Sequence, residues 1–138
     1  MSRKNLDLVR AICETWERGD FSSAEWARPD IEWVIADGVS PGTWVGLDGL
    51  VAGERDFLRG WQEYRLEIEG YRDLDDGRVL ALVHSGGRGK VSGLDLAPIS
   101  SPGAAVFELR DGLVARLVTY YQRARAFEDL GIASKADL

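Results

Sequence analysis

Two segments in the first half of the chain repeat apolar residues at the three- and four-residue spacing of a helix with one buried face. The first predicted helix begins near residue 6 and ends at Gly19-Asp20. Its apolar face consists of Leu6, Val9, Cys13 and Trp16. Residues 22–25, Ser-Ser-Ala-Glu, match a capping box and predict a short second helix. Pro29 ends that helix, because proline disfavours a helical conformation in the residue before it.

The helical pattern returns from Leu47 to Tyr64 and predicts the longest helix of the protein, although three glycines lower its helical propensity. Its broad apolar face consists of Leu47, Leu50, Val51, Leu58 and Trp61. The preceding residues, 37–46, contain three glycines and a proline. This composition predicts a loop that is long enough to arch over a cavity.

Patterns typical of strands occupy the next part of the chain. Residues 31–36 are rich in β-branched and aromatic side chains, which predicts a first strand. Residues 65–71 alternate between polar and apolar, and residues 79–83 are apolar throughout, which predicts a half-exposed strand and a central strand. Glycines at 86, 87 and 89 predict a bend in the sheet, and the two prolines within 97–103 predict a loop.

The last third of the chain has the strongest local signal. Two strand patterns, residues 107–109 and 113–121, flank the sequence Arg110-Asp111-Gly112. The glycine can adopt the positive φ that a tight hairpin turn requires. We therefore predict one long hairpin, followed by a short C-terminal helix that includes residues 126–130.

The order of these elements predicts an α+β fold in a single domain, residues 1–138. A strongly curved antiparallel sheet would wrap around the long helix and two shorter N-terminal helices, with the short C-terminal helix at the end. A sheet bent in this way forms a cone with an apolar interior and a mouth. Such a cone contains a pocket of the kind that binds small molecules.

Composition and charge narrow the classes of partner. The 138 residues are 45% hydrophobic, which is enough for a normal core, and the formal charge of −6 would repel nucleic acid. No apolar segment approaches the ~20 residues of a membrane span, and the N-terminal residues lack the apolar stretch of a secretory signal. The single cysteine, Cys13, predicts a buried thiol in a reducing compartment. We expect a cytoplasmic protein that binds neither nucleic acid nor membranes.

Several weak motifs occur together in a specific order. They are Gly19-Asp20, Pro29 to Trp33, Gly46 to Gly49, Gly87-Arg88-Gly89 with Ser92-Gly93, Arg110-Asp111-Gly112 and Ala126 to Gly131. Through this ordered set the chain resembles the SnoaL-like branch of the nuclear transport factor 2-like (NTF2-like) superfamily over essentially its whole length. Polyketide cyclases, ketosteroid isomerase-like enzymes, epoxide hydrolases, dehydratases and non-catalytic proteins share this fold, so the resemblance implies no single reaction. It implies a homodimer, for which the exposed sheet face is the natural surface.

The positions that carry catalysis in these relatives hold few titratable groups here. The nearest match to the general-base carboxylate after the first strand is Asp37, whereas a count along the strand places Ile35 in that slot. The slots of an oxyanion-stabilising tyrosine and a protonated aspartate fall on Ile12 and Ala105. Gln122 stands where SnoaL-like cyclases have an acid–base aspartate, and an amide cannot exchange a proton with a substrate carbon near neutral pH.

Asp37 and His84 are the candidate catalytic residues. Asp37 lies in the glycine-rich loop, where it either caps a turn or acts as a base in an apolar cavity with Trp33 and Trp44. His84, the only histidine, follows an apolar strand and is either a hydrogen-bonded structural residue or an acid–base group. One histidine and one buried cysteine do not supply a familiar metal site, so we expect no metal.

Large aromatic side chains and one amide are the candidate ligand-binding residues. The tryptophans that could line the cavity wall are Trp16, Trp33, Trp44 and Trp61, although core packing is the usual role of such residues. Successive side chains of a strand point to opposite faces, so either Tyr120 or Tyr121 points into the cone. We favour Tyr120 together with Gln122. An apolar pocket of this kind selects a flat, hydrophobic or aromatic ligand.

Three hypotheses for the function follow. The first is a small-molecule-binding cone, homodimeric and without metal or nucleotide cofactor, for a hydrophobic or aromatic metabolite. The second is a cofactor-independent cyclase, isomerase or dehydratase in which Asp37 or His84 moves a proton next to a carbonyl, polarised by Tyr120 or Gln122. The third is a dimerising scaffold with a filled cone. Ala105 and Gln122 have no side chain that can act as an acid or base, so they favour the first and third hypotheses over the second.

Overall fold

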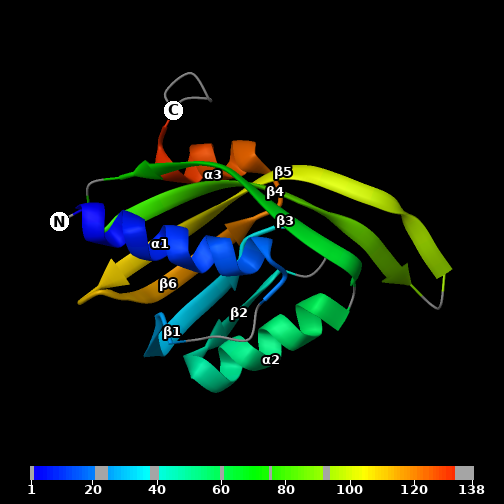
Figure 1. Ribbon diagram of the computed structural model, residues 1–138, viewed down its shortest axis with the longest axis horizontal. Helices are drawn as coiled ribbons and strands as arrows, with labels where there is room; N and C mark the ends of the chain where they lie inside the picture. The colour runs from blue at the N-terminus through cyan, green and yellow to red at the C-terminus, as the bar shows by residue number, and fades with distance from the viewer. Residues whose placement is uncertain are drawn as a thin grey trace.

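A computed structural model of the chain describes residues 2–20, 25–37, 41–59, 61–74, 76–91 and 94–132 (Figure 1). The helices in these residues are α1 (Ser2–Glu17), α2 (Gly46–Arg59) and α3 (Arg123–Leu130). The strands are β1 (Ala27–Ile35), β2 (Gly42–Val45), β3 (Trp61–Asp73), β4 (Arg78–Val91), β5 (Leu94–Arg110) and β6 (Leu113–Tyr120). None of the described helices is both long enough and apolar enough to cross a membrane.

The six strands form one sheet in the order β2-β1-β6-β5-β4-β3. Neighbouring strands are antiparallel except β1 and β6, which run parallel with Trp33 beside Leu117 and Ile35 beside Thr119. The sheet is therefore mixed, and the prediction of a purely antiparallel sheet is wrong for this pair. Most of the chain lies between β1 and β6, which provides the long connection that a parallel pair needs.

The curved sheet has α1 and α2 on one side and α3 on the other (Figure 1). We call the side of α1 and α2 the inner face and the side of α3 the outer face. A large apolar core on the inner face includes Val9, Leu50 and Phe107. A smaller core between the outer face and α3 includes Leu80 and Phe127. The predicted α+β class, with helices covering a curved sheet, is confirmed.

Strand β4 contributes to both cores, as its apolar sequence predicts. Val79, Ala81 and Val83 pack in the inner core, whereas Leu80 and Leu82 pack on the outer side. Successive side chains of a strand point to opposite faces, so a strand that is covered on both sides is apolar throughout. The prediction of a strand buried on both faces is confirmed.

The hairpin between β5 and β6 also forms as predicted. Arg110 pairs with Leu113, so the loop consists of two residues, Asp111 and Gly112. Their φ angles are 54° and 80°. Two central residues with positive φ define the type I′ turn, whose twist matches that of the strands it joins.

The predicted boundaries of the long helix need a correction. α2 ends at Arg59, and Trp61 begins β3, where it pairs with Gly89 of β4. As a result α1, with 16 residues, is longer than α2, with 14. Pairing with β4 therefore takes the apolar residues after 60 into the sheet, which the helical spacing alone did not predict.

The predicted second N-terminal helix is wrong where the structure describes it. Residues 25 and 26 form a turn and Ala27 begins β1, while the capping-box residues 22–24 lie outside the described residues. Pro29 is tolerated within β1 because the pairing with β6 is interrupted between Ala27 and Glu32. Its missing N–H therefore removes no hydrogen bond from that ladder.

Two segments predicted as loops form strands. Residues 42–45 are the edge strand β2, and residues 97–103 belong to β5. In this part of β5, Pro102 lies opposite His84 of β4, whereas β6 pairs with β5 only from Ala104 onward in the described register. A proline can occupy such a stretch because one side of the strand needs no N–H donor.

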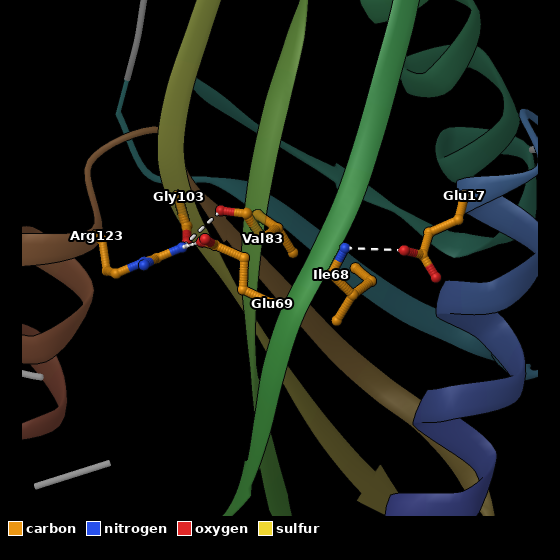
Figure 2. Close-up of polar contacts among 6 residues, drawn as sticks. All are labelled: Glu17, Ile68, Glu69, Val83, Gly103 and Arg123. Atoms are coloured by element: carbon orange, nitrogen blue, oxygen red, sulfur yellow. Dashed lines mark hydrogen bonds and ion pairs between the residues drawn. The ribbon is translucent and has the colours of Figure 1, made fainter.

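Polar contacts hold α1 and α3 to β3 where the pairing of β3 with β4 is irregular (Figure 2). On the inner side, Glu17 of α1 accepts a hydrogen bond of 3.0 Å from the N–H of Ile68. On the outer side, Arg123 of α3 forms three contacts (Figure 2). Its partners are the carboxylate of Glu69 and the carbonyl oxygens of Val83 and Gly103, at 2.9 and 3.1 Å for the two carbonyls. The irregular strand is thus fixed from both faces.

Candidate functional site

Two tryptophans lie side by side on the inner face near the β2 edge of the sheet. Trp33 and Trp44 are directly opposite each other in the β1–β2 pairing, and their ring centroids are 5.2 Å apart. Trp33 is buried and Trp44 is half-buried. A methyl group at Gly53 of α2 would lie 2.8 Å from a Trp44 carbon and 2.9 Å from a Trp33 carbon. This glycine therefore lets the α2 backbone lie directly on both rings.

Glu54 is the next residue of α2 and lies one turn after Leu50, which is 1% exposed in the inner core. Residues four apart share a helix face, and Glu54 is accordingly half-buried. This burial raises the pKa of Glu54 from 4.5 to about 7. Among the described residues, Glu54 has no hydrogen bond or ion pair. The sequence does carry a signal for it, because its neighbours three and four residues away on the helix are all apolar, although an acidic residue in an amphipathic helix normally faces water.

Asp37 follows β1 and is buried, with 8% of its surface exposed. Its two carboxylate oxygens accept hydrogen bonds from the backbone N–H groups of Tyr121, at 2.6 Å, and Gln122, at 3.2 Å. These contacts join the end of β1 to the residues after β6. Asp37 therefore has a structural role, although its hydrogen bonds reach residues across the sheet and not a turn within its own loop.

The order and spacing of these elements match a known family. A family model described as a SnoaL-like domain matches residues 9–117. The chain belongs to the SnoaL-like domain family. The resemblance that the motifs indicated is therefore confirmed. No curated protein matches the sequence significantly.

Solved structures share the SnoaL-like fold over nearly the whole chain. A putative polyketide cyclase from Xanthomonas campestris pv. campestris is 24% identical with a TM-score of 0.69, over 92% of this chain and 96% of that one. An NTF2-like protein of unknown function from Burkholderia pseudomallei is 22% identical with a TM-score of 0.74, over 91% and 95%. TerC, co-crystallized with polyporic acid, is 19% identical with a TM-score of 0.71, over 92% and 97%. These likenesses show an NTF2-like fold.

The catalytic slots implied by the SnoaL-like resemblance are filled by core residues. Ile12, Ile35 and Ala105 all pack in the inner core and are at most 5% exposed. Gln122 is exposed at the start of α3. None of these four side chains can take up or release a proton near neutral pH.

His84 lies on the outer side of the sheet. Val83 packs in the inner core and Leu82 against the outer one, so the alternation of β4 places His84 with Leu82. It pairs in register with Glu67 and lies near Glu69, whose pKa is lowered mainly by the hydrogen bond from Arg123. The structure therefore does not bring His84 together with the tryptophan pair.

Tyr120 points to the outer face, which corrects the predicted orientation. It is buried in the outer core, and its hydroxyl donates a hydrogen bond of 3.0 Å to Asp129 of α3. Burial, followed by that bond, raises the pKa of Tyr120 to about 12. Tyr121 instead packs against the inner core. The alternation placed Tyr120 with Val118 correctly, but alternation alone does not say which face of a strand is the inner one.

Trp16 and Trp61 differ in how far the structure describes them. Trp16 is buried and stacks on Phe107, with 5.7 Å between ring centroids, and meets Trp26 edge to face at 5.9 Å. Its surroundings are those of a core residue. Trp61 begins β3, and its side chain lies outside the described residues.

Cys13 is buried in the inner core, as predicted. Burial raises the pKa of its thiol to about 12, against a smaller opposite effect of its hydrogen bond with Tyr71. The thiol therefore stays protonated near neutral pH and is a poor nucleophile. Among the described residues, no three His, Cys, Asp or Glu side chains lie close enough together to hold a metal ion.

The outer face has a hollow of about 320 Å³ beside α3. It is lined by Val34, Ala36, Arg78, Val106, Glu108, Arg116, Val118, Tyr120, Asp129 and Leu130. Its charged residues continue a row of alternating sign across four strands. In register order the row is Glu32, Arg116, Glu108 and Arg78. Glu32 and Arg116 form an ion pair of 2.8 Å.

Proposed function

We propose that this SnoaL-like protein binds a small hydrophobic or aromatic molecule on the inner face, against Trp33 and Trp44. The observation that carries the proposal is half-buried Trp44, whose ring lies 5.2 Å from the Trp33 ring at an interplanar angle of 35°. Aromatic rings favour offset stacking with other flat π-systems. The co-crystallization of TerC with polyporic acid supports ligand binding by this fold.

Two observations weigh against a reaction that uses Asp37 or His84. The Asp37 carboxylate already accepts two backbone hydrogen bonds, and His84 lies on the opposite face from the tryptophan pair. A cyclase-type reaction, which the putative polyketide cyclase among the similar structures suggests, would need another group. Ligand binding is therefore the function that the site supports best.

Binding is tested by titrating the purified protein with 2-acetylnaphthalene, a flat aromatic ketone, and following tryptophan fluorescence. We expect saturable quenching in the wild-type protein and at least roughly fivefold weaker binding in Trp44→Ala, because a stacking ring is worth about 1 kcal/mol or more. The control is Val45→Ala on the same strand, since Val45 is 65% exposed. Circular dichroism checks that both variants fold. Equal affinity of Trp44→Ala and wild type contradicts the proposed site.

We also propose that the protein forms a homodimer through its outer face. When a second copy faces the first across a two-fold axis, the row of charges runs in the opposite direction. Each arginine then lies opposite a glutamate: Arg78 opposite Glu32 and Arg116 opposite Glu108. Self-complementary charges of this kind fit the isologous contact of a two-fold dimer.

A further inference from the structure

Glu54 is in an apolar environment on its own helix. Its neighbours at three and four residues' distance on α2 are all apolar: Leu50, Val51, Phe57 and Leu58. These are the positions from which a lysine or arginine would form an ion pair along a helix. The sequence of α2 therefore places no basic residue at these positions around Glu54.

Among the side chains that the structure describes, the strands packed against α2 also bring no charge to Glu54. α2 contacts β1, β2 and β3. β1 turns Trp33 and Ile35 inward, whereas its Glu32 is paired with Arg116 on the outer face. β2 contains no titratable residue, and Leu66 of β3 is buried in the inner core, while the side chains of residues 56–64 lie outside the described residues. A carboxyl group without a partner is expensive to bury, so a structural role does not account for Glu54.

We propose that Glu54 is the polar contact of the inner-face site, and that its carboxylic acid donates a hydrogen bond to a carbonyl oxygen of the bound molecule. This assignment rests on the binding function proposed above and narrows the ligand class to aromatic ketones and quinones. Glu54 directly follows Gly53, whose backbone lies on both tryptophan rings, and its side chain is half-buried beside that contact. Because burial raises the pKa of Glu54 to about 7, the acid form is available near neutral pH.

A pair of probes tests this contact: 2-acetylnaphthalene, which has a carbonyl oxygen, and 2-ethylnaphthalene, which has the same shape without it. At pH 6 we expect the wild-type protein to prefer the ketone by roughly fivefold to tenfold, the effect of one hydrogen bond. At pH 8.5 the preference is lost, because the carboxylate repels the carbonyl oxygen.

Two substitutions test whether Glu54 is the cause of the preference for the ketone. Glu54→Ala loses the preference at both pH values, whereas Glu54→Gln, whose amide N–H can still donate, keeps it at both. If both probes bind the wild-type protein equally at pH 6, or if Glu54→Ala retains the preference, the assignment of Glu54 is wrong. If neither probe binds, the proposed binding function itself is wrong.

A second measurement needs no ligand. Between pH 4.5 and about 7 the folded protein retains a proton on Glu54 that the unfolded chain releases, so the free energy of unfolding falls as the pH rises. The difference between wild type and Glu54→Gln isolates this effect from the other carboxyl groups. We expect the variant to gain stability relative to wild type across this window. Parallel stability curves for the two proteins would overturn the assignment.

Discussion

The Asp37 carboxylate illustrates how one residue can hold two distant segments together. Tyr121 and Gln122 are more than eighty positions away in the sequence, yet both donate their backbone N–H groups to its oxygens. A buried N–H that loses its acceptor keeps the full desolvation penalty. Glu54 is the opposite case: it is half-buried with no partner among the described residues, and it is the residue that a ligand would satisfy.

Replacement of Asp37 should therefore destabilise the protein rather than alter a reaction. We expect Asp37→Ala to lower the free energy of unfolding by about 1–3 kcal/mol, because two amide groups lose their acceptor. Asp37→Asn should lose less, since its one carbonyl oxygen still accepts a hydrogen bond. Urea denaturation measures both variants. The control is Asp30→Asn on β1, where the side chain is 76% exposed and the substitution should lower the free energy of unfolding by at most about 0.5 kcal/mol. An unchanged stability of Asp37→Ala would rule out the structural role.

At the scale of elements, α2 packs on the sheet through its glycines. Gly49 and Gly53 are four residues apart, so they lie on the same side of the helix, where Gly49 faces mainly the Trp44 backbone and Gly53 faces the Trp44 ring. From the sequence alone, these glycines are expected only to lower the helical propensity of α2. The tertiary structure gives them a role, because the rings of Trp33 and Trp44 occupy the space where a methyl group at residue 53 would be.

The two glycines should respond differently to alanine. At Gly53 the added methyl group would overlap both tryptophan rings, and overpacking of about 1–3 kcal/mol should exceed the roughly 1 kcal/mol gained in helix propensity. At Gly49 the nearest atom is 3.5 Å away, so Gly49→Ala should be neutral or stabilising by up to about 1 kcal/mol. Thermal unfolding compares the two variants. If Gly53→Ala unfolds at or above the wild-type temperature, the close packing of α2 on the rings is not correct.

At the scale of the whole molecule, the sheet separates two surfaces with different properties. The inner face is covered by α1 and α2 and contains the large core, whereas the outer face is covered by α3 only in part (Figure 1). The uncovered part combines the hollow beside α3 with the row of alternating charges. We therefore propose that the inner face binds the ligand and that the outer face contacts a second copy of the chain.

The dimer can be tested by reversing charges in the row. Glu108→Arg places like charges opposite each other in the facing copy, so we expect the dimer dissociation constant to rise at least about tenfold. The double change Glu108→Arg with Arg116→Glu restores opposite charges and should restore the dimer. Glu14→Arg, an equal change of net charge on exposed α1, is the control. Sedimentation equilibrium measures all four proteins. A monomeric wild-type protein, or no effect of Glu108→Arg, would contradict the proposal.

The sequence by itself determined the features that depend on neighbouring residues. The type I′ turn at Asp111 and Gly112 follows from local backbone preferences, and α1 and the doubly buried β4 follow from the period of their apolar residues. The ordered motifs also identified the family.

The tertiary structure decided what depends on distant contacts. Pairing with β4 made a strand of residues 97–103, and the unpaired stretch of β1 accommodated Pro29. The face to which Tyr120 points was undetermined, because alternation fixes relative and not absolute direction. The unusual pKa of Glu54 also depends on folding: its apolar neighbours on α2 can be read from the sequence, but burial raises the pKa only once the sheet packs against the helix.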